Sequence, residues 1–253
     1  MKKRKLKKGK KIGILFASIL ILFVCIYGLS LSAKLSRVPD TPLNSHLDYP
    51  VQGIDVSAYQ GKIDWGTLSD QGIAFAFIKA TEGSGHVDEY FAYNWKESHK
   101  THLRVGAYHF MSFETPGKSQ ADNFIKTVSQ EKNMLPPVID VELYGGFIQN
   151  PPEAEAVYAI LNPLLERVEK EYGMKPLLYT SGYVYDKYLS GRYEDHDIWI
   201  ADPNLKQPLS DQRNWKFCQY SFEGVLKGYK GEVQHIDLNV FNGSATEFLR
   251  YGK

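Results

Sequence analysis

After residue 50, the chain alternates between short apolar runs and longer stretches in which apolar residues recur every three or four positions. The apolar runs are five to eight residues long, and many are continuous, which is typical of strands buried on both faces of a parallel sheet. Eight such strands are predicted, at residues 53–57, 73–80, 104–110, 137–142, 176–180, 197–201, 215–220 and 235–241.

The stretches between these strands predict helices at residues 64–71, 88–102, 118–132, 153–172 and 183–189. Asp88 and the Pro151-Pro152 pair are helix-start signals, and Gly173 is a stop signal. After Ala201 the helical stretches become short or vanish. The alternation therefore predicts an α/β fold, an irregular (β/α) barrel of eight strands with helices reduced or missing in the last third. In such barrels the active site lies at the C-terminal ends of the strands.

The N-terminus differs from the rest of the chain. Residues 1–11 contain eight lysines and arginines, and no charged residue occurs from 12 to 31, a length sufficient to cross a bilayer. Because positive residues stay on the cytoplasmic side, we predict a basic cytoplasmic segment at 1–11 and a single-pass transmembrane signal-anchor at 12–33. Residues 34–50 contain three prolines and no periodicity, which indicates a stalk before an extracytoplasmic domain at 51–253.

Two other interpretations of the N-terminus compete with an anchor in the cell membrane. A cleaved signal peptide normally has an apolar region of ~7–15 residues and a small-x-small site. Ser30-Leu31-Ser32, followed by Ala33, is a weak site of that kind, and cleavage after about residue 32 would give a secreted protein. A basic nucleic-acid-binding arm is the third interpretation, and the apolar run directly behind the lysines argues against it.

Without its basic block the chain is acidic. Residues 12–253 contain 22 Lys and Arg against 29 Asp and Glu, a formal charge of −7, which argues against nucleic acid as a partner. The two cysteines, Cys25 and Cys218, fall on opposite sides of the predicted membrane boundary and so cannot pair. Cys218 is expected to be a free, buried thiol because it lies in an apolar strand pattern. We expect a monomer.

Two carboxyl groups end the predicted strand at 137–142. Asp140 and Glu142 are two residues apart, so they emerge on the same side of a strand, roughly 6–7 Å apart along the chain. A protonated carboxyl can donate to a leaving oxygen, while an ionised neighbour stabilises the positive charge that develops on a sugar ring. The alternative is that the two acids only solvate a strand end or cap the next helix.

Other predicted strands carry polar groups near their ends: Asp55, Lys79 with Glu82, His109, and Asp237. Their convergence predicts an acidic cleft at one end of the barrel. Asp55 could instead be a turn acid or a partner for Lys79. Asp237 could pair with a buried cation, and Glu82 could start a helix or form a salt bridge. His109 is expected to be a hydrogen-bonded wall residue rather than a proton shuttle.

Five segments between residues 53 and 242 together resemble glycoside hydrolase family 25, in the family's order. This is the family of lysozymes that cut the β-1,4 bond after N-acetylmuramic acid in peptidoglycan. The segments are Gly53-Ile54-Asp55-Val56-Ser57, Phe77-Ile78-Lys79-Ala80-Thr81-Glu82-Gly83, Gly106-Ala107-Tyr108-His109-Phe110, Ile139-Asp140-Val141-Glu142 and Gln219-Tyr220-Ser221.

The resemblance implies roles for four acids in a muramidase-like catalytic domain at 51–253. Glu142 matches the family's proton donor and Asp140 its partner carboxylate. Asp55 and Asp237 match the remaining acids of the cleft, which orient or stabilise the sugar. The resemblance also implies net retention, with an enzyme carboxylate or the sugar's own N-acetyl group as the nucleophile. The implied partner is the glycan strand of peptidoglycan.

Aromatic rings stack on the flat C–H faces of sugars, so aromatic residues near strand ends are candidate substrate contacts. The candidates are Tyr59, Tyr108, Tyr179, Trp199 and Tyr220, although most aromatic residues in a barrel belong to its core. The sequence departs from the family at two positions. The family often has Trp where Cys218 stands and an aromatic residue where Asp202 stands.

Other chemistries lack their motifs. The seven histidines form no H-E-x-x-H or H-x₃-H cluster, so we expect no metal and no cofactor. Ser181 does not lie in a G-x-S-x-G motif, which argues against a serine hydrolase. Two alternatives to a muramidase remain. One is a chitinase-like hydrolase of N-acetylglucosamine polymers, and the other is a non-catalytic cell-wall glycan-binding domain.

Overall fold

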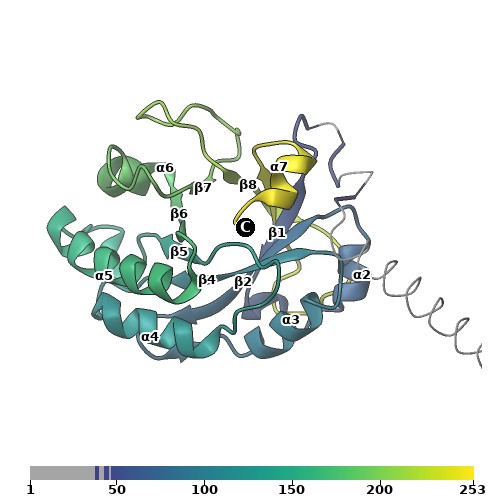
Figure 1. Ribbon diagram of the computed structural model, residues 1–253, viewed down its shortest axis with the longest axis horizontal. Helices are drawn as coiled ribbons and strands as arrows, with labels where there is room; N and C mark the ends of the chain where they lie inside the picture. Colours follow the sequence, from purple (N-terminus) through teal and green to yellow (C-terminus); the bar gives the residue numbers. More distant parts are fainter. Residues whose placement is uncertain (1–37, 40–42, 46) are drawn as a thin grey trace, which may run out of the picture.

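The computed structural model describes residues 38–39, 43–45 and 47–253, and its centre is a closed ring of eight strands (Figure 1). The ring consists of β1 (Gln52–Val56), β2 (Phe75–Glu82), β4 (Arg104–Phe110), β5 (Val138–Val141), β6 (Leu177–Ser181), β7 (Ile198–Ala201), β8 (Phe217–Gly224) and β9 (Ile236–Phe241). A two-residue strand, β3 (His86–Val87), pairs with the end of β2 outside the ring. The predicted eight-stranded irregular barrel is confirmed.

The direction of the last strand was not predicted from the sequence. The strands from β1 to β8 pair in parallel around the ring, whereas β9 runs antiparallel to both of its neighbours, β8 and β1. Strand β9 therefore begins at the end of the barrel where the other seven finish. This reversal decides which end of the barrel receives Asp237.

Helices cover one side of the ring. The longest are α3 (Phe91–Ser98), α4 (Gly117–Thr127) and α5 (Ala154–Tyr172), which lie in a row outside β2, β4 and β5 (Figure 1). The shorter elements are α2 (Trp65–Ser69), α6 (Gly182–Val184), α7 (Ala245–Arg250), the 3₁₀ turns η1 (Ala58–Gln60) and η2 (Gly145–Phe147), and the π-helical turn η3 (Tyr185–Leu189). The predicted helices are present, mostly shortened, and few helical turns follow β6. The six-residue α7 was not predicted.

Aromatic rings fill the inside of the barrel. We call Phe75, Phe77, Trp199, Phe217 and Phe241 the aromatic plug; all are at most 2 % exposed. Phe77 stacks on Trp199 with ring centroids 4.5 Å apart, and the edge of Phe217 meets both Phe75 and Phe77. These rings form the closely packed floor beneath the end of the barrel where the acids lie.

Two strand glycines make room for the aromatic plug. A Cβ atom at Gly53 would lie 2.5 Å from the ring of Phe75, and one at Gly106 would lie 2.7 Å from the ring of Phe77. Both distances are well below ordinary van der Waals contact. These inward positions of β1 and β4 are therefore restricted to glycine by the large rings on β2.

The outward-facing strand residues form a second core beneath the helices. Cys218 belongs to this outer core and is fully buried, as predicted, and it is a free cysteine among the described residues. Its Sγ donates to the carbonyl oxygen of Asp202 at 3.3 Å, and burial raises the pKa of the thiol to about 12. The two departures from the family pattern therefore contact each other on the outer side of the barrel.

The segment before β1 is attached to the barrel end where the strands begin. The Asn44 backbone N–H donates to Gln52 Oε1 at 2.8 Å, and Gln52 Nε2 donates back to the Asn44 carbonyl at 2.9 Å. The Leu43 N–H donates to the carbonyl of Gly72, which precedes β2, and the Tyr49 ring lies 5.4 Å from that of Trp215, which precedes β8. This part of the predicted stalk therefore packs on the barrel.

The predicted segments at 1–11 and 12–33 lie outside the described residues. Within the part of the chain that the structure describes, no helix is both long and apolar enough to span a membrane.

Arg104 closes the end of the barrel where the strands begin, and its removal should destabilise the fold. Its buried guanidinium donates to the carbonyls of Phe248 (2.6 Å), Tyr251 (2.8 Å), Asn133 and Met134 (both 3.2 Å). Arg104→Met should lower the free energy of unfolding by roughly 2–4 kcal/mol, because it leaves these carbonyls without a charged donor.

Denaturant unfolding measures this effect, and Arg250→Met is the matched control because Arg250 is exposed on α7. The control should change stability by about 0.5 kcal/mol or less. Equal stability of the two variants would show that the hydrogen bonds of the Arg104 guanidinium contribute nothing to the stability of the fold.

Candidate active site

Four carboxyl groups gather at the end of the barrel where the parallel strands finish. Asp140 lies near the end of β5, and Glu142 follows that strand. Asp55 lies near the end of β1. Asp237 lies at the beginning of β9, directly opposite Asp55 in the antiparallel register. The ends of two strands, β1 and β5, and the beginning of β9 thus supply the acids that the sequence singled out.

Asp55 and Asp237 face each other across the β1–β9 pair, and each affects the pKa of the other. Burial raises the pKa of Asp55 well above its usual range, and the charge of Asp237 adds to that effect. Burial also raises the pKa of Asp237, although its interaction with Asp55 acts in the opposite direction. The pair therefore holds a proton above the pH at which a solvated aspartate loses it.

Two amide side chains fix the position of Asp55. Gln219 Nε2 and Asn239 Nδ2 both donate to Asp55 Oδ2, at 2.8 and 2.7 Å. Their amide oxygens are held in turn, because the Tyr179 hydroxyl donates to Gln219 Oε1 at 2.7 Å and Trp199 Nε1 donates to Asn239 Oδ1 at 2.8 Å. These bonds determine which end of each amide faces the carboxyl group.

The sequence did not single out Gln219 and Asn239 as site residues. The signal that could have found them is their spacing, since each lies two residues from another inward-facing position: Gln219 from Phe217, and Asn239 from both Asp237 and Phe241. A polar side chain on the inner face of a packed barrel needs a polar partner. That need marks both residues as supports of a buried acid.

Asp140 and Glu142 differ in burial. Asp140 is 5 % exposed, and its Oδ1 has no hydrogen-bond partner among the described residues. Burial, followed by the charge of Glu142, raises the pKa of Asp140 well above its usual range, although Lys79 opposes this. Glu142 is half-buried, and burial, followed by the charge of Asp237, raises its pKa as well. Carboxyls in this environment can remain protonated when a solvated acid would be ionised.

The remaining strand-end residues have structural partners. Lys79 Nζ lies 2.8 Å from Glu82 Oε2, so Glu82 forms the salt bridge that was one of its predicted roles. His109 is fully buried and hydrogen-bonded to Thr81 and Gln120, at 2.7 and 3.0 Å. Burial lowers the pKa of His109 to about 4. It is a neutral wall residue, as predicted, and does not face the carboxyl groups.

The five predicted aromatic contacts occupy three kinds of position. Tyr59 and Tyr108 line a cavity of about 160 Å³ together with Asp55 and Asp237. Tyr179 and Trp199 are 8 % and 2 % exposed, and they lie beneath the site as supports of the two amides.

The structure does not bring Tyr220 to the carboxyl groups. Strand alternation turns Gln219 inward and Tyr220 outward, where its ring packs on the outer core and its hydroxyl accepts a hydrogen bond from Asn44. Tyr220 also lies at an irregularity in the pairing of β8 with β9. We therefore do not retain it as a substrate contact, and the 2 % exposure of Trp199 assigns that residue to the floor of the site.

The connection between β8 and β9 supplies a wall of the cavity that the sequence did not predict. Phe222, Val233 and His235 line the cavity from this hairpin, together with Tyr59. Phe222 is 49 % exposed and Val233 is 37 % exposed, so both present apolar surface at the mouth of the cavity. No periodic pattern marks a loop of this kind, which is why sequence analysis missed it. Among the described residues, no group of three or more His, Cys, Asp or Glu is arranged to hold a metal ion.

Comparisons with known proteins agree on one family. The family model described as glycosyl hydrolases family 25 matches residues 54–229. A relative from Escherichia coli K12, the uncharacterized protein YegX, is 38 % identical over 208 residues, which are 80 % of this chain and 74 % of the relative. Lysozyme M1 of Streptomyces globisporus is 31 % identical over 216 residues, covering 79 % of this chain and 70 % of that enzyme.

Solved structures give the same result. A family 25 glycosyl hydrolase from Bacillus anthracis superimposes with a TM-score of 0.78 at 50 % identity, covering 82 % of this chain and 96 % of that one. A bacterial lysozyme from Streptomyces coelicolor superimposes with a TM-score of 0.72 at 30 % identity, covering 80 % and 96 %.

The raised pKa of Asp140 predicts a stability gain on neutralisation. The folded state binds this proton more tightly than the unfolded state, so the stability is present below the ordinary pKa of 3.8 and is lost as the pH rises through the raised value. Asp140→Asn removes that loss. The variant should therefore melt at a higher temperature than the parent at pH 7.5, by about 2–4 °C for each kcal/mol gained.

Thermal unfolding at several pH values tests this sign. The difference in melting temperature should shrink as the pH falls from 7.5 to 4.5, and Asp70→Asn, at an exposed carboxyl, should show no such trend. A variant that is less stable than the parent at pH 7.5 and equal to it at pH 4.5 would contradict the predicted direction.

Proposed function

Because the chain belongs to glycosyl hydrolase family 25 and is a glycoside hydrolase, we propose that it is a muramidase that hydrolyses peptidoglycan. The bond cleaved would be the β-1,4 bond between N-acetylmuramic acid and N-acetylglucosamine. The relatives named as lysozymes support this substrate class. The observation that carries the proposal is the carboxyl pair at the end of β5, where burial raises the pKa of both Asp140 and Glu142.

Glu142 would be the general acid. It is half-buried, and its raised pKa means that it holds its proton to a higher pH than a solvated glutamate does. In the first step its proton would pass to the glycosidic oxygen while the bond from that oxygen to C1 of the muramic acid breaks. The resulting carboxylate would then accept a proton from the water that attacks C1, which restores the acid.

Asp140 would stabilise the charge at the reacting sugar. Its buried Oδ1 has no partner among the described residues, and an N–H donor from a ligand would satisfy it. The acetamido group of N-acetylmuramic acid supplies such a donor beside C1. A hydrogen bond to this N–H favours attack of the acetamido oxygen on C1, and a carboxylate nucleophile is the alternative; both routes give net retention.

Asp55 and Asp237 would orient the sugar. Asp55 is held by two amides and is 6 % exposed, so its position changes little when a ligand binds. Asp237 is more exposed and lines the cavity with Tyr59 and Tyr108, where a sugar ring can contact both carboxyl and aromatic surface. This arrangement supports binding next to the acid pair on β5.

The substrate alternatives can be separated by products. Purified peptidoglycan should release fragments with N-acetylmuramic acid at the new reducing end, whereas chitin oligomers should be poor substrates. Cleavage of chitin oligomers in preference to peptidoglycan would favour the chitinase-like alternative. Binding to cell walls without any release of reducing ends would favour a non-catalytic glycan-binding domain.

We also propose that residues 12–33 hold the enzyme at the cell membrane with the catalytic domain outside. The support is the uncharged run behind the basic block. Residues 43–45 and 47–50 pack on the barrel end opposite the carboxyl groups, through bonds to Gln52 and Gly72. A membrane anchor before this segment would therefore leave the active site facing away from the bilayer and toward the cell wall.

The proton-donor assignment predicts a large loss of turnover in Glu142→Gln. The amide keeps the shape of the side chain but removes the transferable proton, so kcat should fall by ~10²–10⁴-fold while binding to cell walls persists. The measurement is the release of reducing ends from purified peptidoglycan. Glu166→Gln, on the exposed face of α5, is the matched control and should retain parental turnover. A folded Glu142→Gln protein with the parental rate would transfer the donor role to Asp237 or Asp55.

The anchor predicts the orientation of the full-length protein. Protease added to intact protoplasts should degrade the domain at 51–253, while a cytoplasmic marker protein in the same cells stays protected. Complete protection of the domain would contradict the proposal. Recovery of the protein only from culture fluid, with a new N-terminus near Ala33, would instead support cleavage and secretion.

A further inference from the structure

A second and larger groove adjoins the catalytic cavity. It encloses about 750 Å³ and shares Tyr59 with the cavity that contains Asp55 and Asp237. Its walls come from three loops. The lining residues are Ala58, Tyr59, Gly61 and Lys62 after β1, Glu89 and Tyr90 before α3, and Lys230, Gly231 and Glu232 before β9. The volume lies within the range of pockets that hold small ligands or short peptides.

Buried side chains hold the first two walls together. Asp88 is 4 % exposed, and its carboxylate accepts from the Ala58 N–H at 2.7 Å and from the Tyr90 N–H at 3.0 Å. Asn94, which is 1 % exposed, donates to the carbonyl of Gly61 at 3.0 Å. The loop after β1 is thus attached to the start of α3 by two buried polar side chains.

The loop before β9, which forms the third wall, packs closely against the loop after β1. A Cβ atom at Gly231 would lie 2.0 Å from the carbonyl oxygen of Tyr59, and Gln60 Nε2 donates to the carbonyl of His235 at 3.0 Å. The Val233 N–H donates to the carbonyl of Tyr59 at 3.2 Å. The groove is therefore preorganised, and a ligand would bind without first ordering its walls.

The groove presents charges of both signs that form no ion pairs among the described residues. Lys62, Lys230, Glu89 and Glu232 are all exposed, and none forms an ion pair with another described residue. Lys62 lies over the ring of Tyr93, 5.6 Å from its centroid. Two ammonium groups, two carboxylates and two tyrosine rings match a ligand that carries both charges and some apolar surface.

We propose that this groove binds the peptide branch of peptidoglycan while the glycan strand occupies the catalytic cavity, an inference that rests on the proposed muramidase function. The lactyl group of N-acetylmuramic acid bears a short peptide with free carboxylates, and a diamino acid in that peptide supplies an ammonium group. The neutral sugars of the glycan offer no such charges to the four groove residues. Tyr59, shared by the cavity and the groove, marks the point where the branch leaves the strand.

The test compares two substrates that differ in the peptide branch and in the lactyl carboxylate that its removal frees. One is intact peptidoglycan, and the other is the same glycan strands after an amidase has removed the peptides. The double variant Lys62→Glu/Lys230→Glu should lower kcat/KM on intact peptidoglycan by roughly three- to thirty-fold, since each exposed charge contributes a small amount and its reversal adds repulsion. On the peptide-free strands, the double variant and the parent should be equal within about two-fold.

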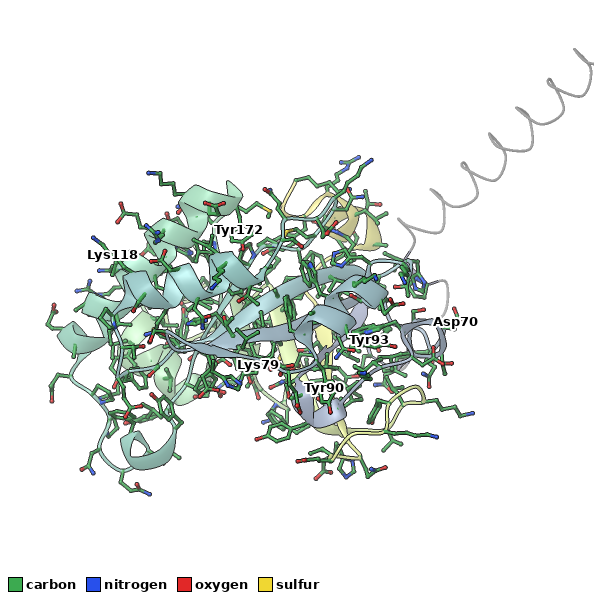
Figure 2. All side chains as sticks on the ribbon, turned by 90° about the horizontal axis from the view of Figure 1, so that it is seen from below. Asp70, Lys79, Tyr90, Tyr93, Lys118 and Tyr172 are labelled. Carbon is green, nitrogen blue, oxygen red and sulfur yellow. The ribbon has the colours of Figure 1, made fainter. Side chains whose placement is uncertain are left out.

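A charge-matched control separates local from overall effects. Lys118→Glu/Lys126→Glu changes the net charge equally on the exposed face of α4, and Figure 2 shows Lys118 well away from Tyr90. This control should act on both substrates as the parent does. The parent should have a higher kcat/KM on intact peptidoglycan than on the peptide-free strands. This difference should decrease when the salt concentration is raised from 50 to 500 mM, because exposed charges are screened.

The outcomes distinguish this inference from the proposed function. If the parent cleaves both substrates and the groove variant loses activity equally on both, or on neither, the groove does not bind the peptide. If the variant loses activity only on the peptide-free strands, the groove binds sugar instead, and the inference is overturned. If the parent cleaves neither substrate, the muramidase assignment itself fails.

Discussion

The burial of carboxyl groups above a floor of packed aromatic rings is the constraint on which the rest of this site depends. The aromatic plug excludes water from below, so burial raises the pKa of Asp55 and Asp140 well above that of a solvated acid. Buried acids need polar partners, which Gln219 and Asn239 supply to Asp55. Asp140 Oδ1 is the exception, because it has no hydrogen-bond partner among the described residues. A ligand can supply the missing donor at this position.

The reversed strand β9 also contributes side chains to this buried site. Along its inner face it presents Asp237 to the cavity, Asn239 to Asp55, and Phe241 to the aromatic plug, in that order from the mouth to the core. A parallel strand with the same sequence would place the acid at the opposite end of the barrel. The antiparallel direction therefore joins the fourth carboxyl group to the site and also creates the β8–β9 hairpin.

That hairpin borders both the cavity with Asp55 and Asp237 and the neighbouring groove. Val233 lines the catalytic cavity, and Gly231, in the same loop, packs against the turn after β1 that separates the cavity from the neighbouring groove. The opposite end of the barrel serves a different purpose, because Arg104 and the segment around Asn44 fasten the two chain ends of the domain there. The two chain ends of the domain and the candidate active site thus lie at opposite ends of the barrel.

The sequence by itself determined the eight-stranded barrel, the family and the acids, because these depend on local patterns. Apolar runs mark buried strands, and the spacing of Asp140 and Glu142 places both on one face of a strand. Only the tertiary structure decided the direction of β9, the inward Gln219 and outward Tyr220, and the place of Trp199 beneath the site. The physical reason is that these features depend on which side chains meet across the closed ring, and such neighbours are distant in sequence. The groove depends in the same way on three loops that have no periodic pattern and adjoin one another only after the barrel closes.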